Sequence, residues 1–183
     1  VLASTDCGIK TAPYTESFNS GQWVGGTGFQ NTGASISPCW TKPTTSPEWG
    51  TRQGPTAIFS SGPSGGQDGK YIYIVSGSSN GFASITSPQI IIPASLNQPH
   101  LFFYYHMYGS QIDSLSVQIN DGSGWTASSW SIQGQQQTSK TAAWKKDSID
   151  LSAYSGDTIQ VRFGGSQFGF QGDIAVDEVS ILP

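Results

Sequence analysis

The stretch Leu101–Tyr108, LFFYYHMY in one-letter code, carries a large apolar or aromatic side chain at every position except His106. Lys70–Ser76, KYIYIVS, is similarly apolar on both faces, so both stretches are expected to form central strands that are covered on two sides. Leu115–Ile119 and Ile159–Phe163 instead alternate apolar and polar residues, the period of two that indicates a strand buried on one face. Strands therefore dominate the predicted fold.

The rest of the chain supports an all-β interpretation. No stretch of twelve or more residues has the apolar spacing of a helix, so helix is limited to a turn or two near Ser152–Tyr154. Asn120-Asp121-Gly122 is a strong hairpin signal, whereas Gly25–Gly54 is predicted to be a long irregular loop. Further strands are expected at Tyr14–Phe18, Ala57–Ser60, Phe82–Ser87, Trp125–Ile132, Trp144–Leu151 and Asp173–Leu182. With no internal repeat or linker, residues 1–183 are predicted to form one jelly-roll-like sandwich of two antiparallel sheets.

The last predicted strand contains a shift in its alternation. Ile174 and Val176 share one parity, while Val179 and Ile181 have the other. A β-bulge at Asp177-Glu178 is the simplest explanation, and it would turn Asp177 inward. The alternative is that this acidic pair is a solvated strand end.

The charge balance excludes several classes of function. The 183 residues contain 12 acidic and 8 basic side chains, giving a net charge of −4, and no basic run exceeds Lys145-Lys146. A nucleic-acid binder of the usual kind is therefore excluded. The longest apolar stretches are far shorter than the roughly 20 residues of a membrane-spanning helix.

The two cysteines lack the spacing of a zinc site. Cys7 and Cys39 have no C-x-x-C partner and no nearby histidine. Two alternatives remain, a disulfide between them or two separate buried thiols. The low Lys and Glu content and the many Gly, Ser and Thr residues favour the disulfide and, with it, an oxidising, secreted or extracellular location.

Ordered motifs along the chain resemble a MAM domain, the module named for meprin, the A5 antigen and receptor tyrosine phosphatase mu. The resemblance runs from about Glu16 to Leu182 and is most specific in two segments, Tyr105–Gly109 and Gly172–Ile181. The other matching motifs are Cys39-Trp40, Trp49, Gly62-Pro63, Asp68, Gly69–Tyr73, Ala83–Pro88, Leu115–Val117, Trp130, Gly134, Trp144 and Phe163–Gly165.

The resemblance implies an extracellular two-sheet sandwich that is one module of a larger polypeptide and is not catalytic by itself. Family members serve adhesion, oligomerisation or ligand binding. The chain departs from the family pattern because the second cysteine pair is missing, with His100 near the expected third cysteine, and because Cys7 lies farther ahead of Glu16 than usual.

Acidic residues at family motif positions suggest a structural cation. Only three Glu and nine Asp are present, and Glu16, Asp68 and Asp177 could converge if the first and last strands are neighbours. Carboxylates and loop carbonyls suit Ca²⁺, or Na⁺, with Asp173 as a reserve ligand. The alternative is that they are isolated surface carboxylates.

Two tryptophans lie outside the family pattern and are candidate ligand platforms. Trp23 and Trp125 both follow Gly-containing turns, and an exposed indole can stack on a sugar ring while polar side chains satisfy its hydroxyls. Ordinary packing is the competing interpretation. Phe168 and Phe170 form a weaker pair, and His106 is expected to be a core histidine.

Basic side chains could recognise sulfate or carboxylate groups on a polymer. The candidates are Arg52, Lys145 and Arg162, with Lys70 and Lys146 also considered, and the alternative is that they only keep the surface soluble.

These observations predict a secreted, non-catalytic module that binds a polysaccharide. A protein-interaction module that adheres or self-associates is the second hypothesis. A small glycan-active enzyme is the third, but Gly62–Gly66 fits G-x-S-x-G only formally because a strand, not a helix, is expected after it.

Overall fold

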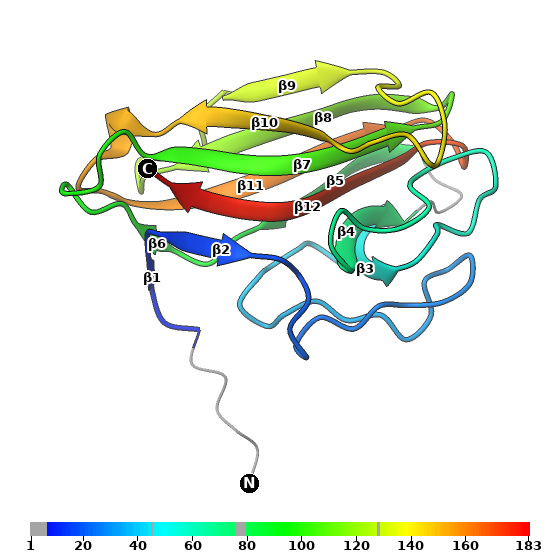
Figure 1. Cartoon of the computed structure of the whole chain (residues 1–183), viewed down its shortest axis with the longest axis horizontal. Coiled ribbons are helices and arrows are strands. Elements are labelled where there is room, and N and C mark those ends of the chain that lie inside the picture. Colours follow the sequence, from blue (N-terminus) through cyan, green and yellow to red (C-terminus); the bar gives the residue numbers. More distant parts are fainter. Residues whose placement is uncertain (1–6, 45, 76–79, 128) are drawn as a thin grey trace, which may run out of the picture.

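The computed structural model describes residues 7–44, 46–75, 80–127 and 129–183, and these residues form two six-stranded sheets packed face to face (Figure 1). The all-β sandwich predicted from the sequence is confirmed. The first sheet has the order β1-β6-β11-β8-β9, with β5 also paired to β11. Its strands are β1 (Lys10–Thr11), β5 (Gly81–Thr86), β6 (Ile90–Ile91), β8 (Ile112–Asn120), β9 (Trp130–Gln133) and β11 (Thr158–Gln167).

The second sheet has the order β10-β7-β12-β4-β3, with β2 also paired to β12. Its strands are β2 (Tyr14–Glu16), β3 (Glu48–Gln53), β4 (Lys70–Val75), β7 (His100–Tyr108), β10 (Lys145–Asp150) and β12 (Asp173–Leu182). The short helix expected at Ser152–Tyr154 is a single 3₁₀ turn. Over the described part of the chain, no helix has the length and apolar character needed to cross a bilayer.

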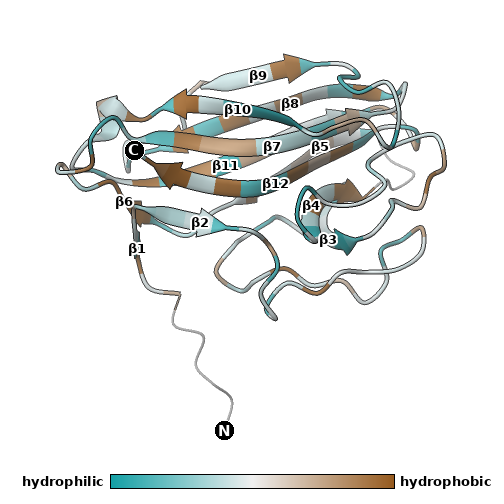
Figure 2. Ribbon diagram, in the orientation of Figure 1, coloured by the Kyte–Doolittle hydropathy of each residue, from teal (hydrophilic) through white to brown (hydrophobic). Residues whose placement is uncertain are grey.

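Alternation along the strands builds the core between the sheets, as the banding in Figure 2 shows. Leu115, Val117 and Ile119 on β8 face the same buried space as Leu101 and Phe103 on β7. Their polar neighbours on β8 therefore point away from the core, because successive side chains of a strand lie on opposite faces.

The bulge predicted in the last strand is present. The register between β12 and β7 shifts between Asp177 and Ser180, and Glu178 has a φ of 50°. The one extra residue returns Val179 to the core face, since the side chains on both sides of the bulge are buried. Asp177 is fully buried, so the alternative of a solvated strand end is wrong.

Coverage on two faces is confirmed for β4 but only in part for β7. The four residues Tyr71–Ile74 are all buried, whereas Phe102, Tyr104 and Tyr108 on β7 are partly exposed. Tyr71, Tyr73 and Ala175 form a small second core on the outer face of the second sheet. Loop residues cover it, and Trp144 belongs to this cover, donating from Nε1 to the carbonyl of Gly65 at 3.2 Å.

Two strand predictions and one loop prediction are corrected by the structure. Ala57–Ser60 is a loop, because prolines precede and follow this short apolar run, and Phe59 within it is 93% exposed. The predicted loop Gly25–Gly54 contains strand β3, which pairs along its whole length with β4. The strand predicted at Trp125–Ile132 begins only at Trp130.

One strand pair is parallel, although two antiparallel sheets are predicted. Lys10 and Thr11 lie beside Ile90 and Ile91 in parallel register. About 80 residues separate the two strands, so no hairpin connection requires them to be antiparallel.

Candidate functional site

A shallow hollow of about 410 Å³ lies on the outer face of the first sheet, over the paired strands β5 and β11. Its lining is mainly polar, with one aromatic ring and two cations. The lining residues are Thr41, Lys42, Pro43, Ser84, Thr86, Trp125, Gln160 and Arg162. Trp125 and Arg162, predicted independently as ligand-binding residues, are therefore brought together by the fold.

Strand register places Arg162 at the centre of this face. Arg162 lies opposite Gln118 on β8 and opposite Thr86 on β5. Its Nε and Nη2 donate to Gln118 Oε1 at 3.0 and 2.7 Å, and its guanidinium carbon lies 4.0 Å from the centroid of the Trp125 ring. Gln118 is itself oriented by a bond from Nε2 to the carbonyl of Thr126. Stacking and hydrogen bonding thus hold the guanidinium in one place.

The hairpin turn predicted at residues 120–122 positions Trp125. Asn120 Oδ1 accepts hydrogen bonds from the amides of Gly122 and Gly124, at 2.8 and 3.2 Å. Both glycines have positive φ, 99° and 130°, which favours glycine. The chain then returns to pair Trp125 with Asn120, so the indole lies beside the end of β8.

A second aromatic residue on this face was not predicted. Phe82 on β5 is 54% exposed, and its ring covers Gly164, where an added Cβ would lie 2.5 Å from Phe82 Cζ. Gly164 is the next residue on the same face of β11 after Arg162, about 7 Å along the strand. Phe82 alternates with the buried residues Ala83 and Ile85. This alternation is the sequence signal that could have placed the ring on the outer face.

Trp23 is not a ligand platform, contrary to the prediction. It is only 1% exposed and packs edge-on against Phe18 and Trp40, at centroid distances of 4.8 and 5.9 Å. The turn before Trp23 directs its side chain into a cluster with these two rings. The three aromatic side chains bury one another there.

Arg52 is also not available to a ligand. It is 8% exposed, and its Nε and Nη1 donate to the carbonyls of Pro55 and Gly28 at 2.8 and 2.7 Å. Lys70 is used similarly, since its ammonium donates to the carbonyls of Asn19, Ser20 and Trp23. These cations tie loops to the sheet.

Lys145 lies far from the hollow in the fold, on edge strand β10 of the second sheet. It is exposed and donates to Gln136 Oε1 at 3.3 Å. The neighbouring Lys146 lies over the ring of Phe102, 4.6 Å from its centroid. The predicted basic residues therefore do not form one site, and only Arg162 joins Trp125.

The predicted cation ligands are not gathered into a cage. Across the described ranges, no three Asp, Glu, His or Cys side chains are grouped to hold a metal. Asp177 Oδ2 accepts from the amides of Gln67 and Asp68 at 2.7 and 3.2 Å, and Oδ1 accepts from that of Glu178 at 2.8 Å. Burial raises the pKa of Asp177 to about 7, while these amides oppose the shift. The reserve ligand Asp173 accepts from Ser61 Oγ.

Glu178 was not in the predicted ligand set, but its carboxylate is repelled by the charges of Asp68 and Glu16. Burial, followed by the charges of Asp68 and Glu16, raises the pKa of Glu178. Burial likewise raises the pKa of Glu16, whose Oε1 accepts from the Phe18 amide at 2.9 Å. A cation near these acids would relieve this repulsion, so Ca²⁺, predicted with Glu16, Asp68 and Asp177 as its ligands, stays a prediction.

Calcium removal gives a direct test. We expect EDTA to lower the melting temperature by about 5–10 °C and excess Ca²⁺ to restore it, because an ion present at about 100 times its Kd stabilises by about 2.7 kcal/mol. Differential scanning calorimetry measures the shift. The Asp68→Asn variant should lose the response to calcium. Identical melting of the wild-type protein in EDTA and in Ca²⁺ would remove the site.

The disulfide alternative is confirmed. Cys7 and Cys39 are bonded, with their Cα atoms 5.0 Å apart, and no free cysteine occurs in the described residues. The bond fastens the segment before β1 to the loop that contains Trp40.

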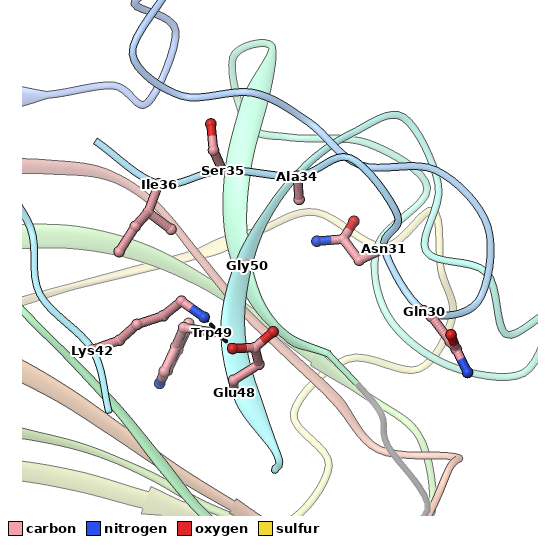
Figure 3. A pocket seen from close by; sticks show the side chains of 9 residues that line it. All are labelled: Gln30, Asn31, Ala34, Ser35, Ile36, Lys42, Glu48, Trp49 and Gly50. Atoms are coloured by element: carbon pink, nitrogen blue, oxygen red, sulfur yellow. Dashed lines mark hydrogen bonds and ion pairs between the residues drawn. The ribbon is translucent and has the colours of Figure 1, made fainter. Parts of the chain in front are cut away.

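A second, smaller hollow of about 70 Å³ is shown in Figure 3. Lys42 lines both this hollow and the first. Lys42 forms an ion pair with Glu48 on β3. Asn31, also in its lining, donates from Nδ2 to the carbonyl of Thr51 at 3.1 Å. The charge of Lys42 is therefore already balanced within the protein.

The fold defines the chain as a jelly-roll-like β-sandwich domain. The K1 cleaved adhesin domain of Lys-gingipain from Porphyromonas gingivalis W83 is similar, with a TM-score of 0.60 at 17% identity, covering 92% of this chain and 96% of that one. TmCBM61 in complex with β-1,4-galactotriose is also similar, with a TM-score of 0.50 at 13% identity, covering 89% and 99%. At these identities the likeness shows the fold alone.

The sequence identifies the family. The pattern of the MAM domain, meprin/A5/mu, matches residues 27–183, and this chain belongs to the MAM domain family. The mouse MAM domain-containing glycosylphosphatidylinositol anchor protein 2 is 30% identical over 154 residues, covering 78% of this chain. The chain spans 16% of the length of that relative.

Proposed function

We propose that this chain is a non-catalytic extracellular module that holds a polysaccharide on the outer face of its first sheet. The observation that carries the proposal is the hollow beside Trp125 and Arg162. Sugar-binding sites combine an apolar ring surface with a few placed polar groups, and here Ser84, Thr86 and Gln160 supply hydroxyl and amide groups around the indole. Phe82 extends the platform along β11.

Binding without hydrolysis fits the lining of this hollow. Glycoside hydrolysis commonly uses two carboxylates that flank the bond to be cleaved. None of the described residues that line the hollow is Asp or Glu. The disulfide and the named cell-surface relative support an extracellular location, where other modules of the same polypeptide would flank this one.

Removing the indole tests the proposal. Trp125→Ala should weaken retention in affinity gels that contain the recognised polysaccharide at least tenfold, about 1.4 kcal/mol, because the apolar ring surface is lost. The measurement is electrophoresis of the wild type and the variant through a panel of polysaccharide gels. Phe168→Ala removes an exposed aromatic residue outside the hollow and should leave retention unchanged. Equal retention of wild type and Trp125→Ala on every retarding polymer would contradict the proposal.

A protein-interaction module is the second candidate, and exposed aromatic residues in the loops favour it. Phe29 and Phe170 contact each other at a centroid distance of 5.6 Å, and both are over 40% exposed. Phe59 and Phe168 are also exposed. Such residues are enriched in protein interfaces. Under this candidate, the chain self-associates at micromolar concentration in sedimentation, and Phe170→Ala abolishes the association.

A further inference from the structure

One of the two cations in the hollow, Arg162, has no carboxylate partner among the described residues. The two cations of the hollow are Lys42 and Arg162, and no carboxylate is present among the described residues that line it. Lys42 is paired with Glu48. Arg162 donates only to the neutral amide of Gln118, among the bonds of the described residues. It is half-buried, and this burial lowers its pKa because the charged form loses water.

Three other buried or partly buried cations are treated differently. Arg52, Lys70 and Lys140 each donate to two or more backbone carbonyls, which anchor loops. In Arg162 the Nε–Nη2 edge of the guanidinium is held by Gln118. Nη1 and the second hydrogen of Nη2 therefore leave the Nη1–Nη2 edge able to form further hydrogen bonds. A planar guanidinium edge matches the two oxygens of a carboxylate or sulfate.

We propose that the Trp125–Arg162 hollow recognises an acidic polysaccharide, with the Nη1–Nη2 edge of Arg162 binding a carboxylate or sulfate group while the sugar packs against Trp125. The inference rests on the proposed function and specifies its ligand class. Gln118 is a positioning residue, since it holds the guanidinium without neutralising it. The protein as a whole carries a net charge of −4, so an acidic polymer must be held locally rather than by overall attraction.

Matched polymers test the ligand class without altering the protein. Polygalacturonate and its carboxyl-reduced form share a backbone and differ in charge, and dextran sulfate and dextran form the second pair. We expect affinity electrophoresis of the wild type to give at least tenfold tighter binding to the charged member of one or both pairs. Preference in the first pair identifies a carboxylate ligand and preference in the second a sulfate.

Three variants assign the effect to Arg162. Arg162→Gln should weaken binding to the charged polymer by about 10- to 100-fold, as expected for loss of a charge-assisted bidentate contact. Gln118→Glu keeps the side-chain length but supplies an internal carboxylate, so it should weaken the same binding at least tenfold without lowering the melting temperature. Lys145→Gln removes an equal charge from the other sheet and should change binding less than twofold.

The outcomes separate the two proposals. If each neutral polymer binds as tightly as its charged partner, and Gln118→Glu has no effect, the acidic ligand is wrong while polysaccharide binding stands. If no polymer of the panel is retained, the proposed function itself fails. If Arg162→Gln loses binding to the charged polymer because it unfolds, the Gln118→Glu variant tests the acidic ligand instead, since it keeps Arg162.

Discussion

Replacing Trp23 by alanine is expected to lower the free energy of unfolding by about 3–5 kcal/mol, the usual cost of removing a buried large aromatic side chain. Trp23 is 1% exposed and contacts Phe18 and Trp40, so the truncation leaves a cavity among rings that cannot all close around it. The carbonyl of Trp23 also accepts from Lys70 at 2.8 Å, which ties this loop to β4. Urea or guanidinium unfolding measures the loss.

Trp125→Ala is the matched control for this prediction. Both variants remove an indole, but Trp125 lies at the surface hollow, so we expect its loss to cost under about 1 kcal/mol in stability. Glycan retention should follow the opposite order and be preserved in folded Trp23→Ala. Equal destabilisation by the two substitutions would contradict the burial of Trp23 and the surface position of Trp125.

Loss of the disulfide has the second large expected effect. Cys7 and Cys39 are 32 residues apart, and closing a loop of this length stabilises by about 3–4 kcal/mol in the chain-entropy account. The free energy of unfolding of the Cys7→Ala/Cys39→Ala double variant should therefore be lower by that amount than that of the oxidised wild type. The variant should unfold at a lower denaturant concentration. Reductant should bring the wild type to the same midpoint.

The response to reductant supplies the control. The double variant has no disulfide, so its midpoint should be the same with and without reductant. A wild-type midpoint that does not move on complete reduction, checked by thiol titration, would show that the bond adds nothing to stability. Intact folding of the reduced protein would still be expected, because the main core lies between the two sheets.

Strand alternation made much of the core predictable. The alternating residues of Leu115–Ile119 and Ile159–Phe163 are buried on β8 and β11 as expected. The parity shift within Asp173–Leu182 marked the bulge, since a strand of period two can keep one face buried across a shift only by inserting residues. Such patterns are local, so they can be read without knowing any partner strand.

Partner-dependent features were not predictable in the same way. Ala57–Ser60 has the composition of a strand but pairs with no strand among the described residues, whereas Glu48–Gln53 lies in a segment of irregular composition and pairs fully with β4. The surroundings of Asp177 were not predictable for a related reason. Asp177 is buried, but on the same face of β12 as Ala175, and its oxygens accept hydrogen bonds from three backbone amides, two of them in the loop before β4.

The sequence by itself determined the all-β class, the family and the local geometry of the turn before Trp125. Only the tertiary structure decided which of two similar tryptophans, and which of two arginines, is available to a ligand. Trp23 and Arg52 meet loop partners that bury them, whereas Trp125 and Arg162 meet each other on an outward sheet face. The physical reason is that exposure depends on what the register and the loops place over a side chain, and those neighbours are distant in the sequence.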